Sequence, residues 1–117
     1  MMPNNDDQTR WRHEYDQRQY RRMLQRLEAF EAGHLHLVEL VADLGTLLTA
    51  LEEMPDDAWA GAFSALCEEL DIINSVATVR AAESSEKVAF SAEEMQRSRE
   101  IAGSLKRLVA PKIDDPR

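Results

Sequence analysis

The sequence predicts an all-α protein, an antiparallel bundle of about four helices. Apolar residues recur three or four positions apart along most of the chain, which is the spacing of one face of an α-helix. The chain holds only four glycines, four prolines and 6% aromatic residues, fewer turn formers than a barrel or sandwich of short strands usually needs. Its 117 residues suffice for one modest core, and the short links between periodic segments favour antiparallel neighbours. We expect one domain over residues 1–110 with helices at about 7–31, 37–53, 57–83 and 92–109, and a flexible C-terminal tail over 111–117.

The first two helices have clear boundaries in the sequence. Asp6 or Asp7 can cap the start of the first helix, and Gly33 follows its last periodic residue as a C-terminal stop. Pro55 stops the second helix, because proline cannot continue a helix interior. Gly45 lies inside that helix at a cost of about 1 kcal/mol relative to alanine, which suggests close approach of a neighbouring helix. The stripe of the second helix comprises Leu37, Leu40, Val41, Leu44, Leu47, Leu48 and Leu51.

The last two helices are also marked by spacing and caps. Apolar residues of the third segment step 4-3-4-3-4 from Trp59 to Ala77, a heptad pattern typical of a helix packed on its neighbours. The fourth helix begins at Ser91, because Ser91 and Glu94 have the spacing of a capping box. Pro111 ends it.

The net charge of −8 is concentrated in the middle of the chain. Residues 1–33 and 80–117 hold nearly balanced numbers of basic and acidic side chains, whereas residues 34–79 hold no lysine or arginine. The acids of this middle segment are Glu39, Asp43, Glu52, Glu53, Asp56, Asp57, Glu68, Glu69 and Asp71. One interpretation is a solvated face that keeps the protein soluble, or that the arginines of the first helix neutralise. The other is a docking surface for a basic protein partner, which would raise the association rate more than the affinity.

Composition and motifs exclude several classes of function. A net charge of −8 disfavours nucleic-acid binding, and no apolar run approaches the ~18 residues that span a bilayer. There is no glycine-rich phosphate loop and no G-x-S-x-G, so we expect no catalytic residue and no cofactor. The N-terminus lacks the pattern of a signal peptide, and the single cysteine, Cys67, fits a reducing cytoplasm. Cys67 is expected to be a packed thiol on the third helix and not a nucleophile.

Two patterns of acidic residues resemble those of metal sites, but both matches are weak. Glu31-x-x-His34 has the spacing found in di-iron bundles, but the second such motif is absent, and Gly33 interrupts the helix before His36. We therefore expect no metal site. Glu52, Glu53 and Asp56 followed by Glu68 and Asp71 are distantly similar to the carboxylates of all-α nucleotide pyrophosphohydrolases of the MazG type, which bind magnesium. Pro55 separates the first acids from a common helical face, so this alternative is less favoured.

The central run LVELVADLGTLLTALEEMPDDAWAGAFSALCEELDIINSVA, residues 37–77, has a leucine-rich helix, a short Pro/Asp turn, and a Trp and Phe four residues apart. It resembles small, acidic, all-α bacterial immunity proteins of polymorphic or contact-delivered toxin systems. The resemblance implies a protein that binds a toxin domain, such as a nuclease, in the cytoplasm of the producing cell and blocks it. Glu52, Glu53, Asp56 and Asp57 would carry the contact, with the other five acids secondary. Trp59 and Phe63 are expected to belong to the core.

The competing hypothesis is a helical adaptor, a chaperone or a self-associating scaffold with no toxin antagonism. The predicted helix 7–31 favours it, because Trp11, Tyr15 and Tyr20 lie among arginines and could pack against a second subunit. This hypothesis predicts a homodimer through helix 7–31.

Overall fold

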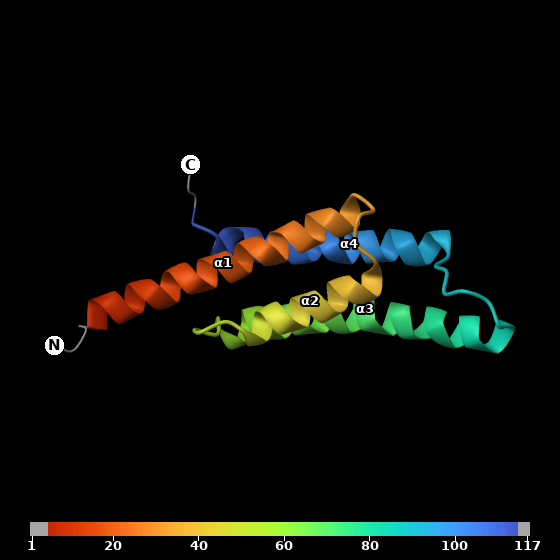
Figure 1. Cartoon of the computed structure of the whole chain (residues 1–117), viewed down its shortest axis with the longest axis horizontal. Coiled ribbons are helices and arrows are strands. Elements are labelled where there is room, and N and C mark those ends of the chain that lie inside the picture. Colours follow the sequence, from red (N-terminus) through yellow and green to blue (C-terminus); the bar gives the residue numbers. More distant parts are fainter. Residues whose placement is uncertain (1–4, 115–117) are drawn as a thin grey trace.

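A computed structural model describes residues 5–114, and side chains from Asp7 onward. The helices are α1 (Asn5–Glu31), α2 (Leu37–Thr49), α3 (Asp57–Ser84) and α4 (Ala92–Val109), followed by the 3-10 turn η1 (Ala110–Lys112). No strand occurs among these residues, so the predicted all-α bundle of about four helices is confirmed. The molecule is elongated, with extents of 64 × 27 × 26 Å (Figure 1).

The four helices pack as a ring in which each contacts two others. α1 lies against α2 and α4, and α3 lies against the same two helices, whereas the backbones of the diagonal pairs in the described bundle do not come close. Each helix therefore turns one apolar stripe toward a shared centre and leaves the opposite face in solvent.

The core forms where the four apolar stripes meet. Each helix contributes side chains that are almost fully buried, and burying one such side chain stabilises the fold by about 1.5–3 kcal/mol. These central residues include Met23, Leu27, Leu40, Leu44, Phe63, Leu70, Ile101 and Leu105.

The helix ends follow the local chemistry of the sequence. α1 ends in a Schellman motif, in which Gly33 has a φ of 84° and His34 N donates to Ala29 O at 2.8 Å. The capping box at the start of α4 is confirmed, because Glu94 N donates to Ser91 Oγ at 3.0 Å and Ser91 N donates to Glu94 Oε1 at 2.8 Å.

Three expected features of the helices are wrong. α2 ends at Thr49 and not near residue 53, because Leu51 turns into the core and is only 8% exposed. α1 already includes Asp6 and Asp7, so neither caps it. The structure also departs from the expectation for Gly45, because a Cβ built there would meet no atom within 4 Å, and no neighbouring helix approaches it.

The segment after α4 is docked on α1 and not loose. Gln17, a buried side chain of α1, donates from Nε2 to Lys112 O at 2.7 Å and accepts from Asp114 N at Oε1 at 2.7 Å. Ile113 packs against the core. The expected tail is therefore wrong for residues 111–114, while residues 115–117 lie outside the described part of the chain.

Candidate protein-binding surface

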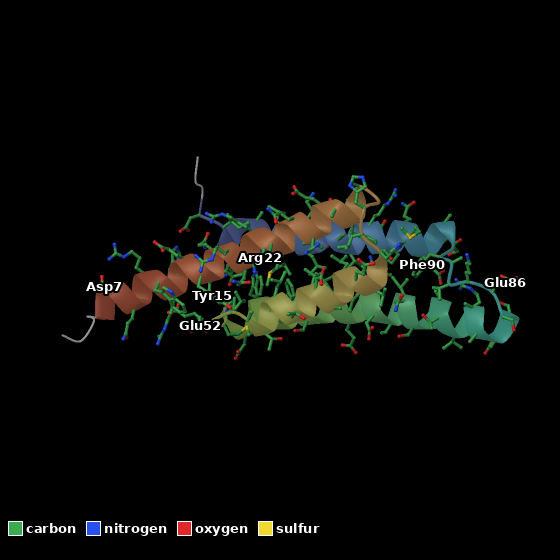
Figure 2. The ribbon with its side chains drawn as sticks, in the orientation of Figure 1. Asp7, Tyr15, Arg22, Glu52, Glu86 and Phe90 are labelled. Atoms are coloured by element: carbon green, nitrogen blue, oxygen red, sulfur yellow. The ribbon has the colours of Figure 1, made fainter. Side chains whose placement is uncertain are left out.

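The turn between α2 and α3 gathers four of the nine predicted site residues at one end of the bundle. Glu52 and Glu53 lie in this turn, Asp56 caps α3 and Asp57 is its first residue. All four side chains are exposed, and no described lysine or arginine forms an ion pair with them. We call Glu52, Glu53, Asp56 and Asp57 the acidic turn; Figure 2 labels Glu52 at its position.

The acidic turn is held in place by a carboxylate of α1. Asp16 is 6% exposed and accepts two backbone hydrogen bonds, from Glu52 N at 2.7 Å and from Glu53 N at 3.0 Å. Hydrogen bonds to an ionised acceptor are stronger than those between neutral groups, so Asp16 fixes the backbone of the turn. The result is a loop whose outward carboxylates are presented by a defined backbone.

Sequence spacing does not mark Asp16 as part of this surface. The available signal is an acid four residues before Tyr20, on the stripe that α1 turns toward the core. Burial, and then the nearby Asp16 carboxylate, raise the pKa of Tyr20 to about 12. A charged group on a buried stripe needs compensating partners, and here they are two backbone amides that follow the end of another helix.

The aromatic residues beneath the turn belong to the core. Trp59 stacks on Phe63 with ring centroids 5.0 Å apart and meets Tyr20 edge-on at 6.0 Å. Its indole Nε1 donates to Leu108 O at 2.9 Å, which satisfies the one polar group of the ring. The expectation that Trp59 and Phe63 are core residues is confirmed.

The other five predicted acids do not join the acidic turn. Asp43 pairs with Arg26 of α1 at 3.4 Å, and Glu69 pairs with Arg97 of α4 at 2.6 Å, so these two lie on opposite flanks of the α2–α3 pair. The remaining three of these five acids, Glu39, Glu68 and Asp71, are exposed and form no ion pair within the described structure.

The same ion pairs test the interpretation that the arginines of α1 neutralise the acids of residues 34–79. Of the α1 arginines whose side chains are described, Arg26 alone pairs with one of the nine acids, and its partner is Asp43. None of these α1 arginines forms an ion pair with the acidic turn, although Arg12 and Glu52 line the same hollow at this end of the bundle.

The side chains of the two acidic patterns considered above as metal sites do not gather in the structure. The Glu31 carboxylate accepts a hydrogen bond from Lys106 Nζ at 2.7 Å, and nowhere in residues 5–114 do three or more His, Cys, Asp or Glu side chains gather as they would around a metal ion. Glu68 lies 12 residues after Asp56, about 18 Å further along the helix axis. Their carboxylates therefore do not converge on one ion.

Cys67 is partly buried against the core, and burial raises its pKa to about 12. The thiol is thus protonated near neutral pH, which is the unreactive form.

None of the described helices combines the length and apolar character of a membrane span.

Comparison of the chain with protein-family models, with curated proteins and with solved structures finds no match.

Proposed function

We propose that this chain is an immunity protein, which binds a cognate bacterial toxin domain in the cytoplasm of the producing cell and blocks it. The observation that carries the proposal is the acidic turn, four exposed carboxylates in a segment without lysine or arginine that α1 leaves unpaired. The resemblance of residues 37–77 to immunity proteins of polymorphic toxin systems supports the same assignment. The partner is a domain with a basic surface, such as the cleft of a nuclease.

The geometry suits binding without catalysis. A cluster of like charges repels itself and destabilises the free protein slightly, but it attracts a cationic partner over several ångströms and raises the association rate. Because Asp16 holds the backbone of the turn, little loop ordering is needed on binding. Glu39, Asp43, Glu68, Glu69 and Asp71 would contribute at longer range only.

Co-expression tests the proposal directly. The gene next to this one is sequenced first. If it encodes a large protein with a variable C-terminal domain, that domain is the probe, produced in a host with and without the full chain. We expect the chain to rescue growth and the purified proteins to form a tight 1:1 complex whose association rate falls steeply as salt rises. Absence of both rescue and complex overturns the proposal.

Charge variants locate the site. E52Q/E53Q/D57N removes three charges from the acidic turn, while E83Q/E86Q/E93Q removes the same number from exposed positions at the opposite end of the bundle, where Figure 2 labels Glu86. We expect the first variant to slow association by about tenfold or more and the second to change it little. Equal effects of the two variants would contradict the assignment of the turn.

A helical adaptor or scaffold without toxin antagonism is the second candidate, and one observation favours it. Trp11 at the start of α1 is 56% exposed, a large aromatic surface of the kind that protein interfaces use. Light scattering separates the two candidates, because an obligate, salt-resistant dimer through α1 fits a scaffold.

A further inference from the structure

The first turns of α1 project beyond the bundle. Figure 1 shows this helix extending past the loop that joins α2 to α3, so that its first turns form one end of the bundle. The contacts that anchor α1 at this end come from Asp16 to the acidic turn, and from Gln17 and His13 to the segment after α4. Residues 5–15, which precede the Asp16 and Gln17 contacts and which we call the overhang, would measure about 16 Å along the helix axis. The His13 contact lies on the side of the overhang toward the segment after α4.

One flank of the overhang is aromatic and cationic. Trp11 and Tyr15 stack with centroids 5.5 Å apart and planes 17° from parallel, and the Arg18 guanidinium lies 5.7 Å from the centroid of Tyr15. These residues are spaced four and three apart, so they occupy one side of the helix. Arg12 is exposed beside them and forms no ion pair with any described side chain.

This flank faces the acidic turn of its own chain across a hollow. The hollow is lined by Asp7, Gln8, Trp11 and Arg12 on α1 and by Glu52 on the turn. Figure 2 labels Asp7 and Glu52. The end of the molecule is therefore a notch. Its wall on the overhang carries Trp11, Arg12 and the Asp7 carboxylate, which pairs with Arg10, and its floor on the turn carries Glu52.

We infer that a second copy of this chain occupies the notch, so that the overhang of each protomer lies across the acidic turn of the other. A two-fold contact uses the same surface on both subunits, so the surface must complement itself. The notch meets this condition, because it carries Arg12 on its wall and Glu52 on its floor. A two-fold axis through the notch would place the Arg12 of each copy near the Glu52 of the other.

The wall of the notch offers a second copy contacts that basic side chains alone do not use. A cationic side chain would be attracted by Glu52 and Asp7, whereas Arg12 needs an acid and Trp11 needs an apolar or aromatic group to cover it. In the dimer, Trp11 is covered at the centre of the contact and the charge pairs surround it, which is the usual arrangement of an interface hot spot.

The dimer is independent of the proposed function and can fail separately from it. A second copy and a toxin domain would compete for the acidic turn, so toxin binding would require the dimer to open. The notch is small, which places the contact among the weak and reversible interfaces. Dimerisation is measured on the pure protein, without a toxin.

A charge swap between two variants of the full chain tests the inference. Sedimentation velocity at low salt should show a monomer–dimer equilibrium that shifts toward monomer as salt rises. R12E and E52R should each weaken the homodimer by about tenfold or more, because each places like charges opposite one another. An equimolar mixture of the two should form a heterodimer. One of its two contacts keeps the parent pair of Arg12 with Glu52, and the other brings the two substituted side chains together with their charges exchanged.

Matched controls separate the contact from net charge and from folding. R99E makes the same charge change as R12E at an exposed position of α4 and should leave the dimer unchanged. W11A should weaken the dimer while the far-UV circular dichroism stays that of the parent chain, because Trp11 is exposed. A parent protein that stays monomeric at low salt and high concentration overturns the inference. So does a dimer that resists R12E and E52R, or a mixture of the two variants that stays monomeric.

Discussion

Replacing Asp16 with asparagine tests whether this buried carboxylate holds the acidic turn. The parent side chain accepts from Glu52 N at 2.7 Å and from Glu53 N at 3.0 Å, using both carboxylate oxygens. Asparagine has the same shape but one acceptor oxygen, and its amide NH₂ would face one of the two backbone donors. D16N therefore loses one of the two hydrogen bonds and the charge assistance of the other.

The size of the effect follows from two opposing contributions. A hydrogen bond to a charged group contributes about 1.5–3 kcal/mol, and D16N loses most of one such bond. Removing the Asp16 charge also relieves repulsion from the acidic turn, which returns part of this loss. We expect a net decrease in the free energy of unfolding of about 1–2 kcal/mol, measured by urea unfolding with an unchanged m-value.

A second measurement locates the effect at the turn. Amide hydrogen exchange at Glu52 and Glu53 should accelerate in D16N, because the acceptor of these two amides is impaired. E53Q is the matched control: it removes one charge from the same turn while the Glu53 side chain forms no hydrogen bond within the described structure. If D16N is no less stable than E53Q, and exchange at the two amides is unchanged, then Asp16 does not hold the turn.

Three further predictions concern single positions. Arg80 and Ser91 lower the pKa of Glu94 to about 2. The ionised Glu94 side chain therefore stabilises the fold above its unfolded-state pKa near 4.5, and this stabilisation is lost as the pH falls toward 2. In thermal unfolding, the stability difference between the parent and E94Q should shrink over that pH range. G45A should stabilise the protein by about 0.5–1 kcal/mol in urea unfolding, because Gly45 is exposed within α2 and a Cβ meets nothing there; a loss of stability would reveal an unseen neighbour. Cys67 should react with a thiol reagent at neutral pH at least about tenfold more slowly in the native protein than in denaturant, because burial raises its pKa to about 12; equal rates would contradict its packed state.

The sequence alone determined the helical class, most helix ends and many of the core residues. Apolar spacing selects the buried side of each helix, so the spacing by itself assigns Leu40, Leu44, Phe63 and Leu70 to the core, where they lie. Caps and stops are equally local, because Ser91 and Gly33 act on backbone groups within a few residues.

Tertiary packing decided where α2 ends and which of the nine acids lie together. α2 stops at Thr49 because Leu51 enters the core and Asp16 accepts hydrogen bonds from the backbone amides of the turn. Asp16 lies 36 residues before Glu52 in the chain. The nine acids separate because α2 and α3 turn different flanks toward α1 and α4, which supply Arg26 and Arg97 as partners. A helical stripe specifies which side of a helix is buried, but the neighbour on each flank depends on how the helices are arranged around the core. Contacts between residues far apart in the chain set that arrangement, so local spacing does not encode it.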